Sequence, residues 1–230
     1  MDRAEFDKFA DEYAAMHRDS IRASGEGPEY FAEYKISDVA RHIKQSDIVV
    51  NRILDFGSGI GASTPYFSRF FPGCELSCVD VSQRSLDIAQ SRFPTAASFH
   101  CFDGQVLPFA DSSFDVIFTA CVFHHIPASA HESMFAEIRR VLAPSGIFFI
   151  FEHNPLNPLT VRVVNECPFD ENAVLIRAGV LADRMIRGGL RPDRPRYRIF
   201  FPNALRKLRG MERALTWCPL GAQYYLSARK

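Results

Sequence analysis

Residues 53–67 read Ile-Leu-Asp-Phe-Gly-Ser-Gly-Ile-Gly-Ala-Ser-Thr-Pro-Tyr-Phe, and this stretch decides the fold. It opens with a short apolar run that predicts a buried strand, and the run stops at Asp55. Glycines then occupy positions 57, 59 and 61, ahead of a predicted helix. Such a turn lets the backbone approach a ligand closely, and the N–H groups that start the next helix favour an anionic group.

Acidic residues follow two later apolar runs. Asp80 comes directly after residues 76–79, at a distance from Asp55 that suits a carboxylate holding ribose hydroxyls. Asp103 ends the next predicted strand and is followed by Gly104. A glycine-rich turn alone is shared with nicotinamide and flavin binders, so these carboxylates must help to decide which ligand is bound.

Strands and helices are predicted to alternate from residue 52 onward. The strands are expected at 52–56, 75–79, 98–102, 114–120 and 146–152, and the helices at 60–70, 82–92 and 130–141. This alternation predicts a doubly wound α/β fold with a mostly parallel, Rossmann-like sheet, whose ligand lies at the carboxyl ends of the strands. Two further strands, 197–201 and 223–228, are expected on either side of a helix near 203–217.

The pattern Asp55-Phe-Gly57-Ser-Gly59-Ile-Gly61 resembles the first motif of class I S-adenosylmethionine (SAM)-dependent methyltransferases of the small-molecule type. Residues 142–151 resemble that family's turn and fifth strand, and the last two predicted strands suit its antiparallel C-terminal strand. The resemblance implies SAM as cofactor, held by Asp55, Gly57, Ser58, Gly59, Asp80, Val81, Asp103 and Gly104. Asp80 would bind the ribose, Val81 would contact the purine ring, and Asp103 would accept from the adenine amino group. For Asp103 and Gly104 the alternative is an ordinary Asp-Gly turn.

The N-terminal segment has its own pattern. Apolar positions in residues 3–20 follow a helical spacing, and residues 6–13 resemble the lid helix of many small-molecule methyltransferases, whose tyrosine, here Tyr13, closes over SAM. The alternative is an amphipathic helix that caps the core. After a break at 25–28, a second helix is expected at 29–45. We therefore divide the chain into an N-terminal helical lid, 1–50, and a SAM-dependent methyltransferase domain, 51–230.

Three histidines are the candidate catalytic residues. His124 and His125 follow the fourth predicted strand of the sheet and His153 follows the fifth. Methyl transfer from a sulfonium is an in-line displacement that needs a base only if the acceptor loses a proton, and histidine titrates near neutrality. The alternative is that a histidine here braces the cofactor loop. No metal is expected, because no nearby carboxylate cluster completes a site.

Composition narrows the class of protein. The six cysteines form no Cys-x-x-Cys pair, so neither a zinc site nor a disulfide framework is expected. The first residues are charged and no apolar run reaches the length of about 18 residues that a membrane span needs, which predicts a cytoplasmic protein without stable membrane insertion.

The formal net charge of zero predicts no nucleic-acid partner, but it hides an asymmetry. Residues 1–115 carry a net charge of −7 and residues 116–230 a net charge of +7. Residues 184–213 alone carry +8. This basic run is expected to pair with the acidic half of the chain. The alternative is an anion-binding rim for a phosphorylated or nucleotide-linked acceptor.

The sequence therefore predicts a SAM-dependent methyltransferase that acts on a small molecule or on a glycan- or lipid-linked acceptor, which would be anionic or sugar-containing. Residues 152–160 and 167–173 resemble a bacterial subgroup associated with such pathways. Two alternatives are an NAD(P)-dependent reductase and a non-catalytic SAM-binding protein. No lysine has a tyrosine four positions before it, which disfavours the reductase. The acceptor and the oligomeric state are left open.

Overall fold

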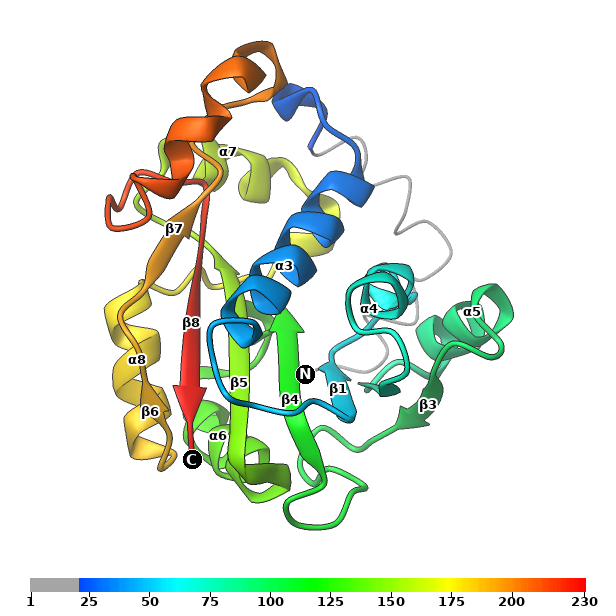
Figure 1. Ribbon diagram of the computed structural model, residues 1–230. Coiled ribbons are helices and arrows are strands. Elements are labelled where there is room, and N and C mark those ends of the chain that lie inside the picture. Colours follow the sequence, from blue (N-terminus) through cyan, green and yellow to red (C-terminus); the bar gives the residue numbers. More distant parts are fainter. Residues whose placement is uncertain (1–20) are drawn as a thin grey trace.

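The computed structural model describes residues 21–230, and within this range a single eight-stranded sheet has the order β3-β2-β1-β4-β5-β8-β6, with β7 also paired to β8 (Figure 1). The strands are β1 (Arg52–Phe56), β2 (Glu75–Asp80), β3 (Ser98–Cys101), β4 (Phe114–Ala120), β5 (Leu142–His153), β6 (Arg191–Pro192), β7 (Arg196–Arg198) and β8 (Gln223–Arg229). Strands β1 to β5 pair in parallel, and β8 runs antiparallel to β5. The predicted doubly wound α/β fold is confirmed.

Helices cover both faces of the sheet. The α-helices are α3 (Pro28–Ile43), α4 (Thr64–Phe70), α5 (Gln83–Arg92), α6 (His131–Val141), α7 (Pro158–Glu166) and α8 (Ala178–Arg187). The 3₁₀ helices are η1 (Arg22–Ser24), η2 (Phe123–His125), η3 (Ala128–Ala130), η4 (Pro168–Asp170) and η5 (Asn203–Arg213). Helix α7 shows why a helix begins where it does. Asn157 caps it by accepting from the N–H groups of Leu159 and Thr160, and Pro158 occupies its first position.

The period-2 pattern of the central strands builds two apolar layers. In β5, Phe148 and Ile150 pack into the layer that α6 and α8 cover. Phe149 and Phe151 pack into the opposite layer, beneath α3 and α4. Because β5 is buried on both faces, it appears in the sequence as a continuous apolar run, as expected of a strand inside a parallel sheet.

Some segments differ from the sequence prediction. The helix expected at 60–70 begins only at Thr64, because the glycine-rich turn extends to Gly61. The turn expected at 142–146 belongs to β5 instead: Phe114 pairs with Leu142 and Val116 with Ile147, so the intervening residues of β5 form a bulge. The last helix is 3₁₀ and ends at Arg213, and α7, α8 and β6 were not predicted.

The predicted lid is described only partially. The helix expected at 3–20, with Tyr13, lies outside the described residues. Helix α3, which falls within the predicted lid range, packs against the sheet through Ile36 and Val39, and Figure 1 shows it crossing the sheet. The division into lid and domain stays a prediction. Among residues 21–230, no helix is long and apolar enough to cross a membrane.

Candidate functional site at the carboxyl ends of the strands

The glycine-rich turn follows β1 and packs against the end of β4. Gly57 has φ +73°, and a Cβ added there would lie 2.4 Å from Cγ2 of Val122. Gly59 has φ +50°, but an added Cβ would have no atom within 4 Å. Gly57 is therefore required by close packing, whereas Gly59 faces open space that a ligand can occupy.

Asp80 ties the end of β2 to this turn. Its Oδ2 accepts from the Gly59 N–H at 2.8 Å, and its Oδ1 accepts from the Ser82 N–H at 2.9 Å. Ser82 in turn caps α5 by accepting from the Ser85 N–H. The carboxylate predicted to bind ribose thus lies beside the glycine turn and also holds it in place.

Two buried polar atoms in the turn lack partners. Asp55 is 2% exposed, and neither its Oδ2 nor the Oγ of Ser58 has a hydrogen-bond partner among residues 21–230. Burial, and then the charge of Asp80, raise the pKa of Asp55 to about 8, with Lys35 acting in the opposite direction. Because buried polar atoms are normally paired, these two fit a ligand that brings its own donors, such as the ammonium of SAM.

Lys35 is a site residue that the sequence analysis missed. It is a buried lysine of α3, and its Nζ lies 3.7 Å from Sγ of Cys121, the residue after β4. Its position three and four residues from Ala32 and Phe31 puts it on the buried face of the helix, which was the available signal. The ammonium provides positive charge near Asp55, where it could hold a carboxylate.

Asp103 and Val81 lie at the neighbouring strand ends. Asp103 is exposed, and its Oδ1 accepts from the N–H groups of Gln105 and Val106 at 2.8 and 2.9 Å, which lowers its pKa. It therefore closes an Asp-Gly turn at Gly104, and an added Gly104 Cβ would lie 3.6 Å from Val81. Contact of these residues with adenine stays a prediction.

His124 is held by a buried carboxylate. Its Nδ1 lies 2.6 Å from Oε2 of Glu152 on β5, and Oε1 of Glu152 accepts from the Phe123 N–H at 2.8 Å. Burial disfavours charge on this imidazole, but the charge of Glu152 and contact with Asp170 outweigh it and raise the pKa of His124 to about 10. Burial likewise opposes ionisation of Glu152, yet His124 keeps the pKa of that carboxyl below its usual value.

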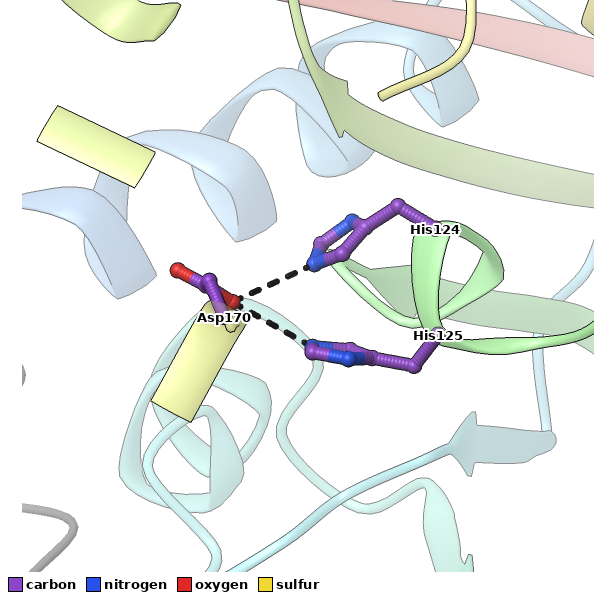
Figure 2. Close-up of side chains that lie close together, drawn as sticks. All are labelled: His124, His125 and Asp170. Atoms are coloured by element: carbon purple, nitrogen blue, oxygen red, sulfur yellow. Dashed lines mark ion pairs between the residues drawn. The ribbon is translucent and has the colours of Figure 1, made fainter. Parts of the chain in front are cut away.

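Asp170 joins both adjacent histidines, as Figure 2 shows. Its Oδ1 lies 3.6 Å from Nε2 of His124 and 3.3 Å from Nε2 of His125. Burial opposes its charge, but the two histidines hold its pKa below the usual range. Burial and the neighbouring His124 lower the pKa of His125, although Asp170 acts in the opposite direction. The structure thus places a carboxylate beside both histidines, where the sequence analysis expected none, and the absence of a metal there stays a prediction.

His153 completes the cluster from the end of β5. Its ring centroid lies 5.3 Å from that of His124, and its Nδ1 lies 3.5 Å from Nε2 of Gln223, whose Oε1 accepts from the Tyr34 hydroxyl. Burial and the charge of His124 lower the pKa of His153 to about 4. The fold thus gathers all three predicted histidines, but their pKa values do not stay near neutrality as the sequence analysis assumed.

Three of the ten basic residues in the run 184–213 form ion pairs with carboxylates of the described residues. Arg198 lies 2.6 Å from Asp38 of α3, and Arg209 lies 2.8 Å from Glu26. Arg187 pairs with Glu132. The contacts of Arg198 and Arg209 favour the interpretation in which the run stabilises the packing of the C-terminal segment on the acidic half of the chain.

Part of the chain matches a known protein family. Residues 54–150 match the methyltransferase domain family. The chain is 36% identical over 104 residues to a biotin biosynthesis bifunctional protein of Cellvibrio japonicus, covering 45% of this chain and 20% of that protein. It is 28% identical over 169 residues to the demethylmenaquinone methyltransferase of Renibacterium salmoninarum, covering 69% and 66%. The chain spans less than half the length of three curated relatives that it matches, namely 20%, 28% and 49% of them.

The fold agrees with these matches. A solved SAM-dependent methyltransferase from Thermotoga maritima superposes with a TM-score of 0.67 at 17% identity, covering 99% of each chain. The chain therefore has the fold of solved SAM-dependent methyltransferases, and residues 54–150 match the methyltransferase domain family.

Proposed function

We propose that this protein transfers the methyl group of SAM to a small-molecule acceptor by in-line displacement. The observation that carries the proposal is the pair of unpartnered buried atoms, Asp55 Oδ2 and Ser58 Oγ, beside the open face of Gly59. Relatives named for methylating demethylmenaquinone, a sterol and a thiol support an acceptor of small size. A glycan- or lipid-linked acceptor, anionic or sugar-containing, is the narrower form of the proposal and rests on the sequence resemblance alone.

The residues of the turn would hold the cofactor. SAM supplies a sulfonium-activated methyl group when bound. Asp55 would pair with its ammonium, Lys35 would pair with its carboxylate, and Asp80 would accept from the ribose hydroxyls. These groups come from different elements, so the cofactor would be fixed by two strands and by α3 at once.

The histidine cluster would serve the acceptor. In-line transfer depends on alignment and on exclusion of water, and a base is needed only when the acceptor loses a proton. His124 and His125 both direct Nε2 at Asp170, whereas His153 contacts Gln223 through Nδ1. We therefore assign proton acceptance to His153, whose Nδ1 would take the proton in place of the 3.5 Å contact from the Gln223 amide, and positioning of the cluster to Glu152 and Asp170.

Calorimetry with purified protein tests cofactor binding. Wild-type protein is expected to bind SAM and S-adenosylhomocysteine, and Asp80→Ala is expected to weaken binding by about 1.5–3 kcal/mol, the range for losing hydrogen bonds to a charged group. Because Asp80 also accepts from Gly59 and Ser82, the variant's folding is checked by its thermal unfolding curve. Binding of NADH at micromolar concentration without any response to SAM would favour a reductase and contradict the proposal.

A pH series tests the role of Asp55. An aspartate ordinarily has a pKa of 3.8, whereas Asp55 in the folded chain has a pKa of about 8, so between these values the folded state holds one proton more than the unfolded state. The cofactor-free protein should lose stability as pH rises from about 4 to about 8. SAM brings a positive charge that favours ionised Asp55, so its affinity should rise by up to about tenfold per pH unit through the upper part of this window.

The matched control is Asp55→Asn, which removes the titrating group with little change in shape. Calorimetry between about pH 6 and about pH 9, on either side of the raised pKa, should give a flatter dependence of SAM affinity for this variant than for the wild type. Equal slopes in the two proteins would show that Asp55 does not cause the pH dependence of SAM affinity.

The acceptor is found by a screen for turnover. Labelled SAM is incubated with the protein and with sugar, nucleotide-sugar, lipid, phenolic and thiol acceptors, and both S-adenosylhomocysteine and the methylated product are measured. Tight SAM binding without transfer to any acceptor class would support the non-catalytic alternative.

A further inference from the structure

We propose that His124, His125 and Asp170 form a binding site for one divalent transition-metal ion. The ligand atoms are Nε2 of each histidine and a carboxylate oxygen of Asp170, and all three lie within 4.8 Å of one another. Figure 2 shows them converging from two segments, η2 and η4. Two imidazoles and one carboxylate suit Zn²⁺, Co²⁺ or Fe²⁺, whereas Mg²⁺ and Ca²⁺ prefer oxygen ligands throughout.

The distances fit ligands of a common ion. The 3.3 and 3.6 Å separations between Asp170 Oδ1 and the two Nε2 atoms exceed those of good N–H···O hydrogen bonds. Ligands bound about 2.0–2.2 Å from an ion at tetrahedral or octahedral angles lie about 2.8–3.6 Å apart. His124 is 2% exposed, and its Nε2 has no hydrogen-bond partner among residues 21–230. A bound ion would satisfy this atom.

Glu152 prepares His124 for this role. It holds Nδ1 of that ring at 2.6 Å and is itself fixed by the Phe123 N–H at 2.8 Å. Metal-binding histidines commonly make this contact through the second ring nitrogen, which fixes the tautomer and leaves the other nitrogen to bind the ion. Glu152 would therefore be a positioning residue for the metal site.

The charge of a divalent cation also matches that of the two carboxylates at this site. Glu152 and Asp170 are both carboxylates in or beside the cluster, and His124 is buried with them. A divalent cation would replace the proton that His124 carries on Nε2, and it would then neutralise the two negative charges without exposing any of them to water. The ion would keep further positions for an oxygen donor, and a role in binding the acceptor rests on the proposed function.

Cobalt is the probe that tests the site. The protein is treated with a chelator, dialysed and titrated with Co²⁺, with visible absorbance reporting coordination, and Zn²⁺ is then added as a competitor in calorimetry. We expect one ion per chain. Asp170→Asn and His125→Gln should each weaken binding by at least about tenfold, and Glu152→Gln by about 10- to 100-fold. His100→Gln, at β3 and outside the cluster, should bind as the wild type does.

Circular dichroism and thermal unfolding verify that each variant is folded, and the binding comparison uses folded variants only. Two substitutions at different ligands keep the test decisive if one of them does not fold. Absence of stoichiometric Co²⁺ binding by wild-type protein would overturn the proposal. So would binding that is equal in the His100 and His125 variants. Because SAM affinity is measured separately, absence of metal binding would not contradict the proposed binding of SAM.

Discussion

Gly57→Ala is expected to lower the free energy of unfolding of the cofactor-free protein by about 2–5 kcal/mol. Alanine would have to adopt φ near +73°, which L-residues rarely do, and its Cβ would lie 2.4 Å from Cγ2 of Val122. The turn cannot move away freely, because the Gly57 N–H donates to the carbonyl oxygen of Val79 at 2.8 Å. Chemical denaturation of the two proteins at the same pH measures the difference.

Gly59→Ala is the matched control. Its φ is also positive, at +50°, but no atom lies within 4 Å of the added Cβ, so only the conformational cost of about 1–2 kcal/mol applies. That variant should instead weaken SAM binding, since the new methyl group enters the ligand space. Combining Gly57→Ala with Val122→Ala should recover the steric component of the loss, seen as a coupling energy in a double-mutant cycle. Equal destabilisation by the two glycine variants, with no coupling, would show that contact with Val122 is unimportant.

The elements that could be predicted from the sequence are those whose own residues form a clear local pattern. Strands β1 and β4 were expected with the bounds that the structure shows, because each is a compact apolar run bounded by turn residues. The segment 142–146 was not, since its Pro and Gly indicate a turn, whereas pairing with β4 tolerates them in a bulge. Residues 158–192 were also missed, because short amphipathic helices there depend on packing against the sheet more than on local pattern.

The residues of the candidate site were likewise predictable only where a local sequence pattern marks them. Asp55, Asp80 and the glycines could be predicted as candidate cofactor residues because motif and strand end coincide along the chain. Asp170 follows no strand and reaches His125 only through the folding of α7 and η4. No local sequence pattern therefore indicates that it belongs to the site. The pKa values could not be predicted either, because they depend on which charges burial brings together, as at His124 and Glu152.

His153→Gln is expected to lower turnover by about 10² to 10⁴ when the acceptor is a hydroxyl, the span for removing a general base. His153 stands at the carboxyl end of β5, beside Gln223, and its pKa, lowered to about 4 by burial and by positive His124, keeps it unprotonated at neutral pH. Glutamine preserves a polar group of similar length, so SAM affinity should change little. Single-turnover rates with labelled SAM and the identified acceptor measure the effect.

Two comparisons decide what the loss of rate means. With an amine acceptor, desolvation and alignment carry more of the catalysis, so the same substitution should cost less than it does with a hydroxyl. His124→Gln should destabilise the fold as well as slow turnover, because it removes the partner of the buried Glu152, whereas His153→Gln should leave the unfolding curve nearly unchanged. If His153→Gln keeps wild-type turnover on a hydroxyl acceptor, the proton goes to water or to another group of the cluster, and His153 only shapes the acceptor site.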